Sequence, residues 1–294
     1  MQIVWSKKNT SFGMLFMLGS GLSFVAVIGL VRNLEGALPA AQASFIRYLI
    51  GAIFFLPYFF RFSVMQLGKS NLWRYFVRSI FHSFGVVFWF YAMSKLPVAE
   101  VTAIGYMTPV FVTLGAVIFF KEKISFWRIG AIILAFLGVL LILRPGFQDL
   151  VFGHAAQISA TMFFAGSYLM VKELTRTESA TAIVAMMTLF VAIALAPLAF
   201  IVWVPPSLME IIVLGFVAFF ATLGHFLMTK ALALAPLTVV QPVTFFQLVW
   251  ATLLGILVFG EAVDLFVVIG GGLIIVSITL ISYRESLLKI KSGP

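Results

Sequence analysis

The chain has 294 residues, of which 63% are hydrophobic and 10% are charged, and its mean hydropathy is +1.15. Because soluble domains contain about 25% charged residues, this composition excludes a water-soluble globular protein and predicts a membrane protein. The net charge of +9 comes from basic residues scattered through short loops, so it reflects orientation in the membrane rather than nucleic-acid binding. The absence of cysteine excludes disulfides, a thiol nucleophile and cysteine metal ligands.

Hydrophobic runs of about 20 residues recur along the chain, each long enough for a helix to cross a ~30 Å hydrocarbon core. The runs are continuous rather than alternating, which favours helices over a β-barrel. The first run is too long for the apolar part of a signal peptide, so we expect it to remain as an uncleaved span. The sequence predicts ten spans, at about 12–31, 40–60, 73–94, 98–119, 126–143, 152–171, 180–202, 208–232, 238–258 and 264–283.

The chain contains an internal repeat. The stretch "YMTPVFVTLGAVIFFKEKIS" at 106–125 recurs in weaker form as "FFQLVWATLLGILVFGEAVD" at 245–264. At nearly the same offset, Phe24 matches Phe164 and Pro57 matches Pro197. We therefore predict an all-α integral membrane protein built from two five-helix repeats, at 1–150 and 151–294. An odd number of crossings per repeat makes the second one inverted relative to the first.

Basic residues are distributed unequally between the two ends of the predicted spans. With the N-terminus inside, the outer ends hold only Arg32, Lys95 and Arg144, and the cytoplasmic ends hold about five times as many. The cytoplasmic set is Lys7, Lys8, Arg61, Lys69, Arg74, Arg78, Lys121, Lys123, Arg128, Lys172, Arg176, Lys230, Arg284, Lys289 and Lys291. This asymmetry predicts a multi-pass protein of the cell (inner) membrane with both termini cytoplasmic.

The same rule explains why the repeat keeps one glutamate and loses two lysines. Glu122 matches Glu261, whereas Lys121 and Lys123 are replaced by glycine and alanine in the second copy, whose turn faces outward. Each glutamate precedes a predicted span. We expect its carboxylate to accept hydrogen bonds from the free N–H groups of the next helix, with an energy-coupling role as the alternative.

These features resemble the drug/metabolite transporter superfamily, in particular its EamA-type members. The resemblance rests on "WFYAMSKLPVAEVTAIGYMTPVFVTLGAVIFFKEKISFWRIGAIILAFLGVLLIL" at 89–143, "KALALAPLTVVQPVTFFQLVWATLLGILVFGEAVD" at 230–264 and "SFIRYLIGAIFFLP" at 44–57. It covers essentially the whole chain and implies carriage of small metabolites. Glu100, where such proteins more often have a small residue, and the charged "FKEKIS" turn depart from the pattern.

Polar residues inside several spans fall on one helical face. In the sixth span, Gln157, Thr161, Phe164 and Tyr168 are spaced by four, three and four residues. Polar groups at this depth turn toward a bundle interior or a water-filled cavity, although hydrogen bonds between helices are the alternative. The predicted substrate-binding residues are Trp89, Thr102, Tyr106, Gln157, Phe164, Tyr168, Phe245 and Gln247, with Gln241 and Thr244 in the same sector as Gln247.

Four ionisable residues are candidates for energy coupling or for the cavity. His82 and His225 lie well inside spans, and Arg47 lies inside the second span, where an intramembrane charge is functional by default. For the histidines the alternative is neutral packing, and for Arg47 it is packing against carbonyls. Glu100 lies at the outer rim, where solvation is favoured over coupling.

Three function classes compete. A secondary carrier using alternating access fits the inverted repeats and polar faces. A membrane enzyme needs a cluster of catalytic groups, and the three histidines, His82, His154 and His225, show neither ligand spacing nor neighbouring acids in the sequence. A channel needs a pore-lining ring.

The sequence has no nucleotide-binding motif, so gradients must drive transport. We expect an amino acid or a derivative as substrate, with a nucleoside-like compound such as S-adenosylmethionine as the alternative. We expect no cofactor, no metal and no nucleic-acid partner. The protein should sit in the lipid bilayer as a monomer or a homodimer.

Overall fold

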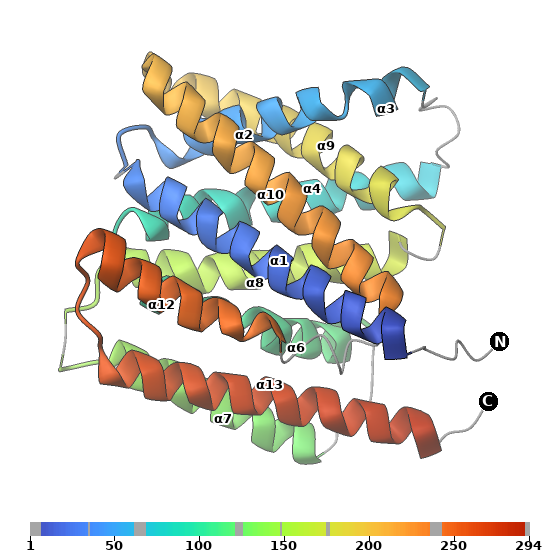
Figure 1. The fold of residues 1–294 in the computed structure, drawn as a ribbon, viewed down its shortest axis with the longest axis vertical. Helices are drawn as coiled ribbons and strands as arrows, with labels where there is room; N and C mark the ends of the chain where they lie inside the picture. The colour runs from blue at the N-terminus through green and yellow to red at the C-terminus, as the bar shows by residue number, and fades with distance from the viewer. Residues whose placement is uncertain are drawn as a thin grey trace.

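A computed structural model describes residues 7–34, 36–61, 69–120, 126–147, 149–174, 177–235 and 243–291, and these residues form an all-helical bundle (Figure 1). The first-half helices are α1 (Lys7–Asn33), α2 (Ala40–Phe54), α3 (Leu56–Arg61), α4 (Lys69–Met93), α5 (Val98–Gly105), α6 (Thr108–Phe120) and α7 (Phe126–Leu143). The second-half helices are α8 (Phe152–Leu174), α9 (Ala180–Ile201), α10 (Leu208–Leu234), α12 (Phe246–Phe259) and α13 (Leu265–Lys291).

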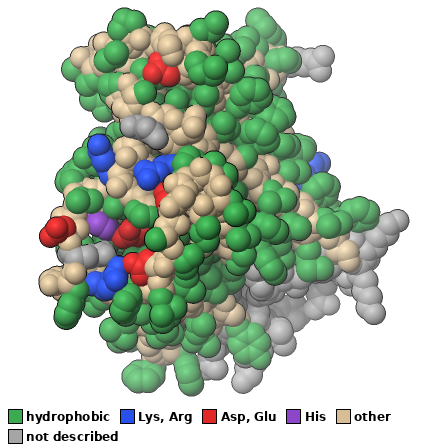
Figure 2. Space-filling model, turned by 60° about the vertical axis from the view of Figure 1, so that its left-hand side comes forward, with side chains coloured by type: hydrophobic (Ala, Val, Ile, Leu, Met, Phe, Trp, Pro, Cys, Tyr) green, Lys and Arg blue, Asp and Glu red, His purple; other side chains and the backbone are tan. Residues whose placement is uncertain are grey.

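The predicted spans coincide with these helices, singly or as a consecutive pair, so the predicted fold class is confirmed. Within the described residues, six helical segments are long and apolar enough to cross a membrane, and α2, α12 and part of α13 are shorter apolar helices. Many large apolar side chains lie on the outside of the bundle, and Figure 2 shows them spread over its surface. Lipid tails cover such a surface in a membrane protein.

Three predicted spans are interrupted within the described residues. The second divides at Phe55 into α2 and α3, and the ninth is interrupted at Phe245, directly before α12. The fourth divides at Tyr106 and Met107, because Pro109 has no N–H to give to the carbonyl of Gly105. The hydroxyl of Thr108 donates to that carbonyl instead, at 2.9 Å.

The helices pair as an inverted repeat requires. The helix α1 packs on α10, and its counterpart α8 packs on α4. The pairs α2 with α9 and α7 with α13 join matched helices of the two halves. The next contacts come in repeat-related sets, α6 with α8 and α1 with α12, then α4 with α9 and α2 with α10. In Figure 1, α1 and α8 run in opposite directions along the bundle, and the beginning of α1 and the end of α13 lie at the same end of it.

Matched contacts in the two halves show the repeat at the level of side chains. A Cβ on Gly85 would meet the ring of Phe164 at 2.7 Å, and a Cβ on Gly224 would meet the ring of Phe24 at 3.2 Å. The two rings occupy matched sequence positions, and so do the two glycines. In both halves, therefore, a missing side chain lets an aromatic ring lie directly on the neighbouring helix.

Candidate functional site

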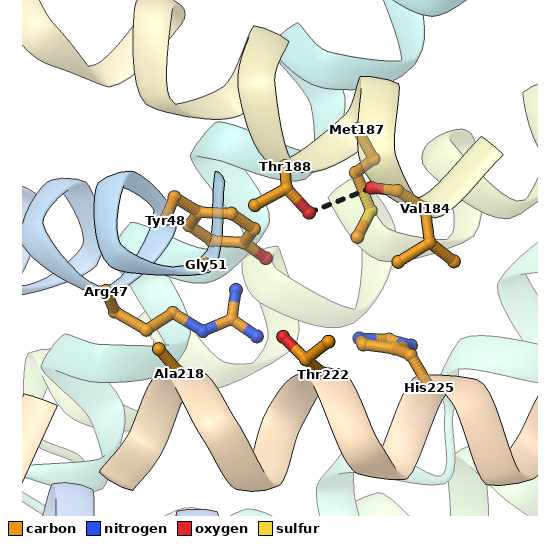
Figure 3. A pocket seen from close by; sticks show the side chains of 9 residues that line it. All are labelled: Arg47, Tyr48, Gly51, Val184, Met187, Thr188, Ala218, Thr222 and His225. Atoms are coloured by element: carbon orange, nitrogen blue, oxygen red, sulfur yellow. Dashed lines mark hydrogen bonds between the residues drawn. The ribbon is translucent and has the colours of Figure 1, made fainter. Parts of the chain in front are cut away.

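A small cavity lies inside the bundle between α2, α9 and α10 (Figure 3). Its volume of about 10 Å³ accommodates roughly one water molecule. A metabolite therefore needs these helices to separate. The lining residues are Arg47, Tyr48, Gly51, Val184, Met187, Thr188, Ala218, Thr222 and His225.

The cavity is lined by matched positions of the two repeats. Arg47 and Met187 are related by the offset that relates Pro57 to Pro197, and so are Tyr48 and Thr188. Both members of each pair line the cavity, so the space lies where the two halves meet. Inverted-repeat carriers bind their substrates at this interface.

The most polar wall of the cavity belongs to α2 and α10. The Arg47 guanidinium, the Thr222 hydroxyl and the His225 ring point toward the same space in Figure 3. Arg47 is 9% exposed, and its guanidinium carbon lies 3.9 Å from the centre of the Tyr48 ring. No carboxylate of the described residues forms an ion pair with Arg47. Of the residues predicted from sequence, Arg47 and His225 line this cavity.

A second buried arginine lies beside the cavity and corrects a prediction. Arg78, which the charge count assigned to the cytoplasmic ends, is only 7% exposed within α4. The helix begins at Lys69, so Arg78 lies more than two turns inside it. Its guanidinium donates to the Ile183 carbonyl at 2.9 Å and to the sulfur of Met187, a lining residue, at 3.2 Å. Arg78 is thus buried inside the bundle rather than solvated at a helix end.

His82 does not line the cavity but is linked to it through Tyr48. The Tyr48 hydroxyl lies 2.6 Å from His82 Nε2, and the Ser167 hydroxyl lies 3.3 Å from His82 Nδ1. Both ring nitrogens therefore have a partner, and the ring also packs on Phe164 with 5.1 Å between centroids. Phe24, the repeat counterpart of Phe164, also packs on a histidine: its ring centroid lies 5.1 Å from that of His225, in an edge-on arrangement.

Tyr106 and Phe245 meet where the fourth and ninth spans are interrupted. They occupy matched positions in the two repeats, and their ring centroids are 5.7 Å apart. The Tyr106 hydroxyl donates to the Thr244 carbonyl at 3.0 Å. Gln247, the second residue of α12, lies beside Gly21 of α1. The expected approach of these two spans is thus present, although these residues do not line the cavity of Figure 3.

Two of the remaining predicted polar residues, Thr102 and Gln157, have hydrogen-bond partners within the bundle. Thr102 donates to the Val98 carbonyl of its own helix at 2.8 Å, and Gln157 donates to the Val101 carbonyl at 2.8 Å. Trp89 packs edge-on against Phe90. Tyr168 shares the helical face of Gln157 but is 46% exposed, so this face of α8 changes from buried to open along its length.

Charged side chains gather at the end of the bundle opposite the termini, which Figure 2 turns toward the reader. Glu100, expected to be solvated at a rim, is 7% exposed and lies 2.9 Å from His154 Nε2. His154 is 6% exposed. This finding corrects the expectation for Glu100. It also corrects the statement that the histidines have no neighbouring acid, because α5 and α8 bring together residues that are 54 positions apart.

Glu261 caps a helix, but not the one expected. Its Oε2 accepts from the N–H of Val98, the first residue of α5, at 2.8 Å, and its Oε1 lies 3.2 Å from Arg32. Asp264 instead caps the next helix, by accepting from the N–H of Phe266 at 2.8 Å, and it also pairs with Arg144. Glu122, together with Lys121, Lys123 and Gln241, lies outside the described residues.

Sequence reasoning missed Tyr48, Arg78, His154 and Thr222 as site residues. Signals existed for two of them: Tyr48 follows Arg47 directly, and Arg78 falls inside the predicted span 73–94. No local signal identifies His154 or Thr222, because their significance depends on helices that are distant in the sequence.

Comparison with known proteins agrees with this architecture. The profile of the EamA-like transporter family matches the chain twice, at 11–144 and at 151–283. Three similar proteins with assigned roles align over nearly their full length. They are a riboflavin transporter of Vibrio cholerae, 26% identical over 93% of this chain and 94% of that protein; an S-adenosylmethionine uptake transporter of Rickettsia bellii, 26% over 95% and 96%; and the pseudopaline exporter CntI of Pseudomonas aeruginosa, 25% over 92% and 95%.

A solved crystal structure shares the fold, with a TM-score of 0.63 over 95% of this chain and 99% of the other. At 17% identity, this likeness concerns the fold alone.

Proposed function

The chain belongs to the EamA-like transporter family and is a multi-pass secondary transporter of small metabolites, and we propose that its substrate is an amino acid or an amino-acid derivative bound through its carboxylate. The observation that carries this proposal is the Arg47 guanidinium, which is buried in the membrane part of the bundle, faces the cavity and has no carboxylate partner among the described residues.

A buried cation requires compensation. Removing a guanidinium from water costs several kcal/mol unless an anion or hydrogen bonds compensate. The Tyr48 ring supplies part of the compensation for Arg47 through a cation–π contact. The neighbouring Arg78 makes its described hydrogen bonds with the Ile183 carbonyl and the Met187 sulfur. A substrate carboxylate supplies the missing charge, because a guanidinium fork matches its two oxygens.

The other lining groups suit the rest of such a substrate. Thr222 and His225 offer polar atoms on α10, and the Tyr48 ring offers an apolar face. We extend the site toward Tyr106, Phe245 and Gln247, because interrupted helices commonly form the binding site of inverted-repeat carriers. An S-adenosylmethionine-like compound remains the alternative, since its methionine part carries the same carboxylate.

We propose that both termini are cytoplasmic and that the repeats divide near residue 150. The positive-inside rule supports the orientation. In addition, Arg32 and Arg144, at the opposite end, each form an ion pair, which lowers the free positive charge there. We place the protein in the inner membrane.

The test is a thermal-shift screen of purified protein against amino acids and their matched carboxamides, which lack the carboxylate. A ligand at 100 times its Kd should stabilise the protein by about 2.7 kcal/mol. Acids should stabilise it and amides should not. Arg47→Gln should weaken acid binding by about 10- to 100-fold, the equivalent of a charge-assisted hydrogen bond of roughly 1.5–3 kcal/mol.

Lys230→Gln is the matched control, because it removes an exposed cation from α10. It should leave binding unchanged. Equal stabilisation by acids and amides, or undiminished binding in Arg47→Gln, would refute the carboxylate proposal.

A further inference from the structure

We propose that the Glu100–His154 pair is a proton-binding site that links proton uptake to closure of the end of the transporter opposite the termini. This site is separate from the cavity of Figure 3 and is independent of which substrate the protein carries. The pair joins the two repeats, because Glu100 lies in the first turn of α5 and His154 lies in the first turn of α8.

The groups around His154 offer hydrogen-bond partners to both ring nitrogens in the neutral and in the protonated state. Its Nδ1 lies 3.1 Å from both the backbone nitrogen and the carbonyl oxygen of Val151. In the neutral ring, Nδ1 accepts from the Val151 N–H while Nε2–H donates to Glu100. In the protonated ring, Nδ1–H donates to the Val151 carbonyl and Nε2–H still donates to Glu100. A proton can therefore bind or leave without creating an unpaired nitrogen.

The two states differ in net charge. With a neutral imidazole the pair carries the single negative charge of Glu100, and with a protonated imidazole it is a net-neutral ion pair. Burial disfavours an uncompensated charge, so the closed arrangement favours the protonated pair. Loss of the proton favours access of water to Glu100, which requires this end to open.

The surrounding charges do not replace the proton. Arg144 and Asp264 pair with each other, and Arg32 pairs with Glu261. Their net contribution is close to zero. Gln157, the next polar residue on the same face of α8, is neutral and donates to the Val101 carbonyl.

A water-accessible space reaches Glu100 from the side of α12 and α13. A cavity of about 50 Å³, several times the volume of one water, is lined by Glu100, Thr252, Ile256, Glu261 and Asp264, among others. Glu261 in this cavity also holds the N–H of Val98, two residues before Glu100. A change in the Glu100–His154 contact can therefore reach the turn between α12 and α13 through the bond from Val98 to Glu261.

The test uses the absence of native cysteine. Thr252→Cys places a thiol in this cavity, and Phe147→Cys places one at an exposed position outside it, in the loop between α7 and α8, as a reference. A membrane-impermeant maleimide is applied to each variant over a range of pH. The labelling rate of Thr252→Cys is divided by that of Phe147→Cys, which removes the intrinsic pH dependence of thiol reactivity. We expect this labelling ratio to rise several-fold from acidic to alkaline pH.

Glu100→Gln should remove the rise of the labelling ratio with pH, because no carboxylate is then left uncompensated when the proton leaves. His154→Gln should shift the rise to another pH, because Glu100 then titrates without its imidazole partner. Asp149→Asn, which removes an exposed carboxylate near α8, should leave the pH dependence unchanged. A labelling ratio that does not change with pH while Glu100 and His154 are both intact overturns the proposal. This result needs no substitution of the pair that could impair folding. The same dependence in both pair variants, or its loss in Asp149→Asn, also overturns it. No substrate is used, so the result is independent of the carboxylate test.

Discussion

A single methyl group added to Gly255 should loosen the contact between Glu261, in the turn after α12, and the start of α5. A Cβ at this position would lie 2.6 Å from Glu261 Oε2, the atom that accepts from the Val98 N–H. The carboxylate is also held by Arg32, and the Glu261 N–H binds the Gly255 carbonyl at 2.9 Å. With contacts on several sides, the carboxylate cannot move without losing one of them.

The expected magnitude follows from two opposing terms. Val98 is fully buried, so losing its hydrogen bond should cost about 1–3 kcal/mol, whereas replacing glycine by alanine within a helix should return about 0.5–1 kcal/mol. Gly255→Ala should therefore destabilise the protein by up to about 2.5 kcal/mol. Gly272→Ala, where the added Cβ meets no atom within 4 Å, is the control and should stabilise it.

Thermal unfolding in detergent, followed by tryptophan fluorescence, measures both effects. A double-mutant cycle identifies the cause, because Gly255→Ala should become stabilising in a Glu261→Ala background, where no carboxylate opposes the methyl group. The reasoning is refuted if Gly255→Ala raises the melting temperature, or if its cost is the same with and without the Glu261 side chain.

Three further predictions concern orientation and the site. In intact cells, the cysteine of Lys123→Cys should be protected from an impermeant reagent and that of Ala262→Cys should react. The reason is that the positive-inside rule places the two turns on opposite sides of the membrane. The reverse labelling pattern would show the opposite orientation. Tyr106→Phe should lower the free energy of unfolding by about 0.5–1.5 kcal/mol, because the hydrogen bond to the Thr244 carbonyl is lost. Tyr106→Ala should also weaken substrate binding, measured by thermal shift. Wild-type behaviour of both variants would exclude a role for Tyr106 at the interruption of the fourth span. His82→Gln should weaken binding by loosening Tyr48 while leaving the pH dependence of the labelling ratio intact; a flattened ratio would move the proton site to His82.

The fold could be predicted from sequence because its main signals are local or periodic. Span length and continuous hydrophobicity determine the helices, and matched residues such as Phe24 and Phe164 show the repeat directly. The position of the break after Gly105 also has a local cause in Pro109. Each of these features depends on a short stretch of chain or on a constant offset.

The site was only partly predictable, because its contacts cross the bundle. Glu100 and His154 carry no distinguishing pattern in their own helices, and only the packing of α5 on α8 makes them a pair. Glu261 illustrates the same limit: local capping rules point to the helix that follows, whereas the fold brings the first turn of α5 within reach. Arg78 was misplaced because a charge count does not separate a residue at a helix end from one buried two turns inside.

The two repeats agree where they pack and differ where they face the cavity. Phe24 on Gly224 repeats Phe164 on Gly85, so the surfaces between neighbouring helices keep one shape in both halves. At the cavity, Arg47 is matched by Met187 and Tyr48 by Thr188. Equal packing lets the halves exchange equivalent arrangements at similar energy, which alternating access requires. Unequal lining places a cation on only one side of the cavity, so we expect an asymmetric metabolite, if bound there as proposed, to have one preferred orientation in a nearly symmetric scaffold.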